Sequence, residues 1–335
     1  MTEALLTIKN LSIGIYSGIY PGGKKQILSS VKDISFDLYP GEILGLAGES
    51  GSGKSLTALS IPGLLSENKK ITGGAIYYYG RNNSEKINLL NLKEDELKTI
   101  RGKEISMIFQ EPFTSLNPLM KIKDQVAETL ALHGEKDKTG NYKRVKELFG
   151  QLHFSEPEKV MESYPHRLSG GMCQRVMIAL AVICRPGLLI ADEPTTALDQ
   201  NTQTQILNLL KEINRVFGTS ILFISHDLGL LKNFCSRLLV MYSGRILEEG
   251  NTEEIFAKPS HEYTKGLLAS IPNKANRGKD LTAIPGRIPT LEEGRPSGCP
   301  FHPRCGRVTE LCRLEFPAAR AVNSSHKTHC ILEEI

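Results

Sequence analysis

The stretch Gly48-Glu49-Ser50-Gly51-Ser52-Gly53-Lys54-Ser55 reads G-x-x-x-x-G-K-S, the pattern of a phosphate-binding loop. The apolar run 42–47 before it is typical of a buried strand, and residues 56–61 after it suit a helix. Glycines let the backbone N–H groups turn toward phosphate, and the helix N-terminus adds positive charge. We therefore expect Lys54 to reach the terminal phosphates of a nucleotide and Ser55 to hold Mg²⁺. The alternative, a chance glycine-rich turn, does not account for the flanking strand and helix.

The bulk composition is that of a globular protein with about two domains, because the chain has 335 residues, 40% of them hydrophobic. A net charge of +4 is too small to indicate nucleic acid as the main partner, so we predict none. The longest apolar run, Val176 to Cys184, is shorter than the roughly 20 residues that span a bilayer. The first residues also lack the basic segment of a signal peptide. The sequence predicts a cytosolic protein, or one held on a membrane by a partner.

Short buried strands alternate with helical patterns along most of the chain, which predicts an α/β fold with a largely parallel sheet. Three apolar runs, 105–109, 188–191 and 220–225, end in polar residues. Ligands of such sheets lie beyond the carboxyl ends of the strands, where the phosphate loop also lies. Between about 119 and 164 the apolar spacing is helical, which predicts a helical insertion.

The polar residues at these strand ends suit ATP hydrolysis. Asp192 is predicted to bind Mg²⁺, and Glu193 to polarise the attacking water. Gln110 could sense the metal and the water, and His226 could contact the γ-phosphate. Taken alone, Glu193 could be a surface carboxylate, and Gln110 or His226 could be ordinary packing residues.

A second anion site is predicted at Ser169-Gly170-Gly171, where a helix begins with free N–H groups. If the two phosphate-binding devices cannot reach one nucleotide within a chain, two chains must meet head to tail around a shared ATP. The alternative is an ordinary capped helix after a glycine turn.

Together these motifs resemble the nucleotide-binding subunit of an ABC transporter. The family's elements match in order: Gly48–Ser55 (Walker A), Gln110 (Q-loop), Leu168–Met172 (signature), Leu188–Glu193 (Walker B), Ala197-Leu198-Asp199 (D-loop) and His226 (switch histidine). The resemblance implies a P-loop NTPase core over residues 1–255. That core would carry an antiparallel β subdomain and a helical subdomain at about 111–168. It also implies that Asp199 lies at the dimer interface.

A narrower resemblance is to the importer ATPases for oligopeptides, dipeptides and nickel. It rests on Phe109–Pro118, His261–Leu268 and Gly298–Cys305, and implies a C-terminal domain over 256–335. Such a subunit would pair with a second, homologous ATPase under two permeases, at the cytoplasmic face of the membrane, served by an external binding protein. It would dock its permease near 110–115 and the helical block. Nickel or another small solute is the alternative cargo, and a soluble ABC ATPase or a redox sensor is the alternative class.

The chain departs from the family pattern at two places. An aromatic residue usually stacks on adenine, whereas the aligned Gln26-Ile27-Leu28 is aliphatic, leaving Tyr20 as a substitute. The signature is followed by Cys173, where a basic or polar residue is common. The second departure leaves Ser169 and both glycines in place, so phosphate binding should persist.

Four cysteines, Cys299, Cys305, Cys312 and Cys330, crowd the last 37 residues. In a cytosolic protein such crowding indicates a metal more than disulfides, and thiolates suit Zn²⁺ or an iron–sulfur cluster. The importer resemblance implies a [4Fe–4S] cluster, and a structural role is favoured over a redox role because nothing nearby in the sequence indicates an electron partner. Zinc, with His302, His326 or His329 as substitute ligands, and unmetallated cysteines remain alternatives.

Overall fold

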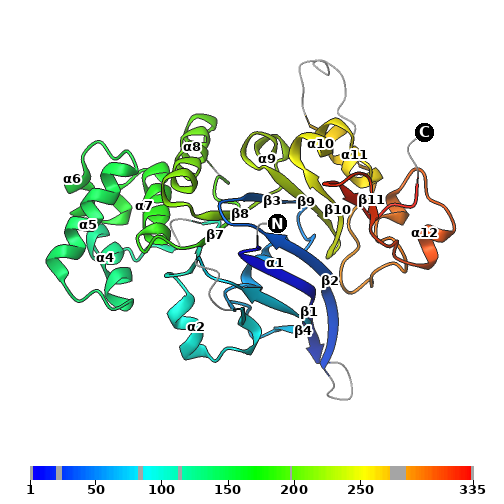
Figure 1. The fold of residues 1–335 in the computed structure, drawn as a ribbon, viewed down its shortest axis with the longest axis horizontal. Coiled ribbons are helices and arrows are strands. Elements are labelled where there is room, and N and C mark those ends of the chain that lie inside the picture. The colour runs from blue at the N-terminus through cyan, green and yellow to red at the C-terminus, as the bar shows by residue number, and fades with distance from the viewer. Residues whose placement is uncertain are drawn as a thin grey trace.

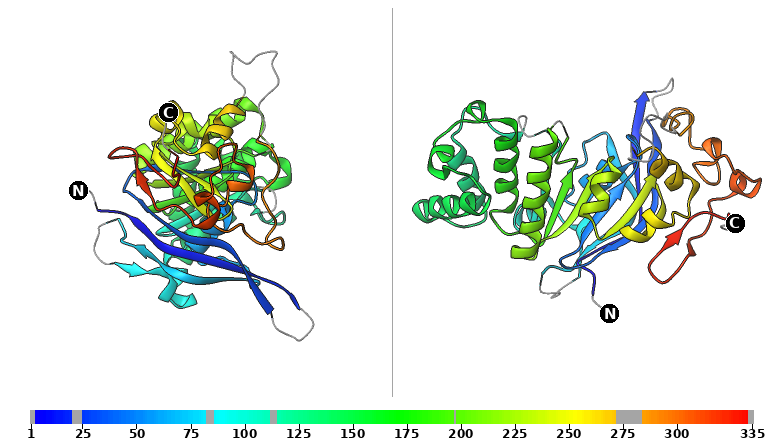
Figure 2. Two further views of the ribbon diagram at one scale, coloured as in Figure 1. Left: turned by 90° about the vertical axis from the view of Figure 1, so that its right-hand side faces the viewer. Right: turned by 90° about the horizontal axis from the view of Figure 1, so that it is seen from above.

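The computed structural model describes residues 3–19, 25–81, 86–111, 115–196, 198–271 and 284–332. Its elements are arranged along one long axis (Figure 1). Helices α4 to α7 gather at one end, a large sheet occupies the middle, and the C-terminal elements lie at the other end; the view from above agrees (Figure 2).

The central sheet has eight described strands in the order β11-β12-β10-β9-β3-β8-β7-β6. Strands β9, β3, β8, β7 and β6 are parallel, and β10, β12 and β11 continue the sheet in antiparallel pairing. The predicted parallel sheet is confirmed, with an antiparallel edge that the sequence did not indicate. The strands are β3 (Ile43–Ala47), β6 (Ile105–Ile108), β7 (Leu188–Asp192), β8 (Ser220–Ser225), β9 (Arg237–Tyr242), β10 (Arg245–Asn251), β11 (Arg320–Ala321) and β12 (Lys327–Thr328).

A second, four-stranded sheet is antiparallel throughout, as the resemblance implied. Its side chains share one hydrophobic core with the central sheet: Leu6 and Ile8 belong to the same buried cluster as Leu46 and Ile190. Burial of that shared apolar surface fixes one sheet over the other. The strands are β1 (Leu6–Ile19), β2 (Lys25–Leu38), β4 (Lys69–Tyr78) and β5 (Ile87–Asn88), followed by η1 (Leu89–Asn91) and α2 (Glu94–Ile100).

The helical block continues the core of the central sheet instead of forming a separate unit. One buried cluster runs from Phe149 through Ile178 to Ala191 and Ile221 in the strands. None of the described helices is both long enough and apolar enough to cross a membrane. The block contains α4 (Ile122–Leu132), α5 (Lys138–Gln151), α6 (Pro157–Met161), η2 (Pro165–Arg167) and α7 (Gly170–Val182). The other helices of the core are α1 (Lys54–Ser60), α8 (Gln200–Phe217), α9 (Leu228–Phe234) and α10 (Thr252–Ala257).

The C-terminal elements are fastened to the sheet by aromatic packing and by one buried carboxylate. The rings of Tyr242 on β9, Tyr263 and Phe301 lie within 4.6–5.4 Å of one another. Glu248 of β10 is fully buried and accepts hydrogen bonds from the backbone N–H groups of Ser260 (2.7 Å) and His261 (3.0 Å). These contacts place α11 (Glu262–Ala269), η4 (His302–Arg304) and α12 (Leu311–Leu314) beside the central sheet.

Candidate active site

The phosphate loop connects β3 to α1 and needs glycine at two positions for steric reasons. Gly48 has φ +149°, and a Cβ there would lie 2.1 Å from the carbonyl oxygen of Met241. Gly53 has φ +102° and immediately precedes α1. Side chains at either position would therefore force the loop out of shape.

Lys54 is buried inside the curve of this loop. Its Nζ donates hydrogen bonds to the carbonyl oxygens of Gly48 (2.8 Å) and Glu49 (2.9 Å). Burial lowers the pKa of Lys54, and the carboxylates of Glu193, Asp192 and Glu49 oppose that shift. The ammonium thus lies at the centre of the loop, where phosphate oxygens could replace the two carbonyl oxygens as its hydrogen-bond acceptors.

Ser55 and Asp192 together provide hard oxygen ligands for a divalent cation. Ser55 Oγ donates to Asp192 Oδ1 at 3.1 Å, which joins the start of α1 to the carboxyl end of β7. Burial raises the pKa of Asp192, and the Ser55 hydrogen bond partly offsets this. A cation between these oxygens would favour the ionised carboxylate, so the donor set fits Mg²⁺.

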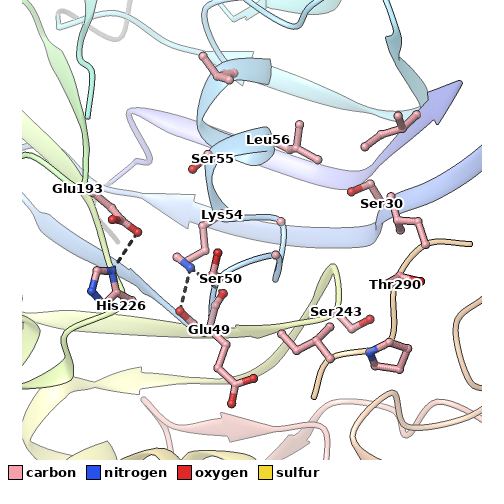
Figure 3. A pocket seen from close by; sticks show the side chains of 18 of the residues that line it. Ser30, Glu49, Ser50, Lys54, Ser55, Leu56, Glu193, His226, Ser243 and Thr290 are labelled. Atoms are coloured by element: carbon pink, nitrogen blue, oxygen red, sulfur yellow. Dashed lines mark hydrogen bonds and ion pairs between the residues drawn. The ribbon is translucent and has the colours of Figure 1, made fainter. Parts of the chain in front are cut away.

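The three residues predicted for catalysis meet around one carboxylate, although they come from the ends of three strands. Glu193 Oε2 accepts hydrogen bonds from Gln110 Nε2 (3.3 Å) and Thr196 Oγ1 (3.1 Å), and its Oε1 lies 3.1 Å from His226 Nδ1. Glu193 has φ +48°, an unusual value for a residue with a side chain. Figure 3 shows Glu193 and His226 pointing toward each other, with Lys54 beside them.

These groups line a cavity of about 1020 Å³, a size suited to a nucleotide. Glu193 and His226 lie on one side of the loop, whereas Ser30, Ser243 and Thr290 lie on the other (Figure 3). Sequence reasoning did not single out these three residues, because no motif marks them.

The residues considered for adenine stacking do not occupy the position that we expected. Ile15 of β1 lines the cavity, but Gln26, Ile27 and Leu28 do not. Tyr20 lies outside the described residues, as do Ala197 of the D-loop motif and residues 112–114 of the importer-type segment.

The second predicted anion site lies elsewhere. Ser169 is exposed, and its Oγ accepts a hydrogen bond from the N–H of Met172 at 3.4 Å, so it caps α7. Ser169, Gly170 and Gly171 do not line the cavity that contains Lys54. Asp199 caps α8 in a similar way, accepting from the N–H groups of Asn201 and Thr202 at 3.0 Å.

The four clustered cysteines converge on a small cavity next to α11, and all seven cysteines are free thiols. Burial raises the pKa of Cys299 to about 12 and also raises the pKa values of Cys305 and Cys330. Across the described ranges, no group of three or more His, Cys, Asp or Glu side chains is arranged to hold a metal ion. The four cysteines therefore share one cavity, but in the structure their side chains are not arranged as a site for a metal ion.

Histidines contribute to this cavity differently from our expectation. His302 and His329 line it, together with His261, which the sequence did not single out. His326 does not: its Nε2 lies 2.6 Å from Glu248 Oε1, and both side chains are buried. His326 has a packing role on the central sheet, so it is removed from the candidate ligands.

Comparison with known proteins gives consistent relatives over the whole length. Residues 31–196 match the family model "ABC transporter", and residues 247–312 match "Oligopeptide/dipeptide transporter, C-terminal region". The chain is 45% identical to the oligopeptide transport ATP-binding protein OppD of Haemophilus influenzae, covering 98% of this chain and 97% of that protein. It is 43% identical to the oligopeptide transport ATP-binding protein AppD of Bacillus subtilis, covering 99% and 98% respectively.

Solved structures show the same cassette. The dimeric post-hydrolysis ATP-binding cassette MJ0796, bound to ADP and Pi, aligns with a TM-score of 0.62 and 30% identity. That alignment covers 74% of this chain and 98% of the solved one. About one quarter of the chain therefore lies outside this alignment.

Proposed function

Because the chain belongs to the oligopeptide/dipeptide group of ABC transporter ATP-binding proteins, we propose that it supplies the ATP hydrolysis that drives peptide import through a membrane permease. One observation carries the proposal. At the strand ends, Gln110 and His226 both contact the Glu193 carboxylate, next to the Ser55–Asp192 pair and Lys54. The relatives are named as transport proteins for oligopeptides or dipeptides, which favours peptides over nickel as cargo.

In this mechanism each group has one task. Lys54 and the loop N–H groups hold the β- and γ-phosphates, while Ser55 and Asp192 hold Mg²⁺, which neutralises charge in the transition state. Glu193 accepts the proton of the attacking water. Gln110 and His226 keep the Glu193 carboxylate turned toward the γ-phosphate, because each contacts one of its oxygens.

We propose further that the working unit is a head-to-tail pair with a second, homologous ATPase. Ser169 is exposed at the start of α7 and lies outside the Lys54 cavity, so the N-terminus of α7 could meet the nucleotide of a partner. Asp199, at the start of α8, would lie at the same interface. The cassette MJ0796 was solved as a dimer, which supports this arrangement.

The permease and the membrane position follow from the same reasoning. Two large apolar side chains near the importer-type segment face solvent: Phe109 is 41% exposed and Leu119 is 86% exposed. Apolar surface of this kind at the helical block suits docking under two permease subunits. The subunit would then sit at the cytoplasmic face as a peripheral protein, with an external binding protein delivering the cargo. A domain boundary at about residue 255 would separate the ATP-binding domain from the C-terminal domain.

For the cysteine cavity we propose a structural [4Fe–4S] cluster, with zinc as the alternative. Four thiols surround one cavity, and a cluster takes its four thiolates at wider spacing than a single ion does. Anaerobically purified protein should contain about four iron and four sulfide per chain, and the Cys299→Ser, Cys305→Ser double variant should lose them. Stoichiometric zinc, or metal-free folded protein, would overturn this assignment.

The function is tested with the Glu193→Gln variant in the assembled transporter. ATP hydrolysis and peptide uptake should fall at least about a hundredfold while ATP binding persists, because only the proton acceptor is lost. Glu212→Gln, on the outer part of α8, is the matched control and should leave both activities unchanged. Parental hydrolysis by Glu193→Gln would refute the catalytic assignment. Failure of the chain to co-purify with membrane subunits would favour a soluble ABC ATPase.

A further inference from the structure

Part of the wall of the ATP cavity is made by the C-terminal part of the chain. Residues 288–291 and Arg295 line the cavity, together with Ile15 of β1 and Ser30 of β2, and Arg295 donates a hydrogen bond to the Ser30 carbonyl oxygen. Figure 3 shows Thr290 next to Ser30, across the phosphate loop from Glu193 and His226. The cavity is therefore shared between the nucleotide-binding core and a segment more than 230 positions further along the chain.

Hydrogen bonds and an ion pair within residues 287–293 stabilise this segment. The Thr290 N–H donates to Glu293 Oε2 (2.9 Å), and the Glu293 N–H donates to Thr290 Oγ1 (3.3 Å). Arg287 forms an ion pair with the same Glu293 carboxylate. The turn is thus held in shape without a ligand, and its aliphatic side chains at 288, 289 and 291 face the cavity.

Arg295 follows this turn and carries a positive charge that is partly buried. Its Nη2 donates to the Ser30 carbonyl oxygen, which bridges 265 positions of sequence. Its Nε and Nη1 are buried with no hydrogen-bond partner, and no carboxylate of the described residues pairs with it. Burial lowers its pKa to about 10, and the neighbouring Arg245 adds to that effect. Such a cation is costly to bury unless an anion approaches it.

The orientation of ATP follows from the other end of the cavity. The γ-phosphate must lie near Lys54 and Glu193, where hydrolysis takes place. The ribose and base then extend away from Glu193, toward the side that carries Ser30 and Thr290. There they would meet aliphatic side chains and a positive field.

We propose that residues 288–295 form the nucleoside wall of the ATP site. The aliphatic side chains of Ile288 and Leu291, together with Ile15, would take the base, and Arg295, whose guanidinium nitrogens are buried in the cavity wall, would add positive charge near the ribose and α-phosphate. This proposal rests on the ATPase function given above and adds the part of the nucleotide that the known motifs do not hold. The C-terminal segment is then part of the ATP site and not only an accessory to it.

The test measures binding of ATP and of inorganic tripolyphosphate to the full chain by titration calorimetry. Leu291→Ala should weaken ATP about threefold to tenfold and leave tripolyphosphate unchanged, because only ATP has a base to bury. Arg295→Ala should weaken ATP about tenfold, and more than it weakens tripolyphosphate. Arg320→Ala is the matched control, since Arg320 also has a buried, unpaired Nε but does not line the cavity.

Parental ATP affinity in both Leu291→Ala and Arg295→Ala would overturn the proposal. Equal weakening of the two ligands by Leu291→Ala would also overturn it, because the loss would then reflect a displaced phosphate loop. If the unaltered chain bound neither ligand, the ATPase function itself would fail, and that outcome is distinct from both.

Discussion

Replacing Arg304 with alanine should weaken ATP binding although Arg304 does not line the ATP cavity. Arg304 lies in η4, and its guanidinium donates two hydrogen bonds to the Glu49 carboxylate in the phosphate loop. Nη1 lies 2.7 Å from Oε2, and Nη2 lies 3.3 Å from Oε1. The Glu49 backbone N–H also donates to Tyr263 Oη at 3.0 Å. The loop is therefore held at one residue by two contacts from the C-terminal part of the chain.

The magnitude follows from how far this pair is shielded from water. The Arg304 side chain is 7% exposed and that of Glu49 is 28% exposed, so the pair is more protected than a surface salt bridge, yet the carboxylate can still be solvated. Hydrogen bonds between charged groups contribute about 1.5–3 kcal/mol. Solvation of the freed Glu49 returns part of this, which leaves about 1.5 kcal/mol, or a tenfold loss of ATP affinity if the loop must be in this shape to bind.

The assay is ATP titration of the full chain, combined with a double-mutant cycle. Arg304→Lys should give an intermediate loss, because lysine keeps the charge but not the two-pronged geometry. In a Glu49→Ala background, Arg304→Ala should have little further effect. If Arg304→Ala has the same effect with and without Glu49, or no effect in a normally folded protein, the contact does not support the loop.

Two further predictions concern the dimer and the buried carboxylate. Ser169→Asp should leave ATP binding by the single chain unchanged but abolish ATP-dependent association, measured by light scattering, because Asp still caps α7 while it puts negative charge where a partner's phosphate would dock. Glu248 is expected to support the fold at neutral pH and to lose that effect in acid. Burial opposes its ionisation, but hydrogen bonds from His326 and from the backbone N–H groups of Ser260 and His261 lower its pKa below the usual value. The stabilisation is therefore present above about pH 4.5 and lost as pH falls through the lowered pKa. Unfolding of Glu248→Gln, followed by circular dichroism, should show about 1.5–3 kcal/mol less stability at pH 7 and a smaller difference near pH 3.

The catalytic side of the site could be predicted from sequence because each residue directly follows a buried strand. Gln110, Glu193 and His226 stand within two positions of the ends of β6, β7 and β8, and parallel neighbours bring such ends to one edge. The apolar runs therefore predicted the strands, and the parallel order of the strands predicted that the side chains at their ends would meet. The helical insertion was predictable for the same reason, since its apolar spacing differs from that of the strands.

The nucleoside side of the cavity could not be predicted in this way. Ser30 and Arg295 are joined across 265 positions, and Glu49 and Arg304 across 255. No sequence pattern links the two members of either pair, because the spacing between a motif and a distant single arginine carries no periodic signal. The cysteines show the same limit: their crowding indicated a cluster, but only packing excluded His326, which the buried Glu248 holds on the central sheet.

The C-terminal segment thus contacts the phosphate loop through two groups, the Tyr263 hydroxyl and the Arg304 guanidinium. The positions of both groups depend on one hydrophobic cluster. Arg304 lies between Cys299 and Cys305, and Cys299 packs in the same cluster as Tyr242, Tyr263 and Phe301. A change at the cysteine cavity that moves this cluster must also move the Tyr263 hydroxyl and the Arg304 guanidinium, because the rings are in contact and interiors are densely packed. Both groups bind Glu49. A structural role for the cysteine cavity is therefore sufficient to make the phosphate loop sensitive to its occupancy, without any electron transfer.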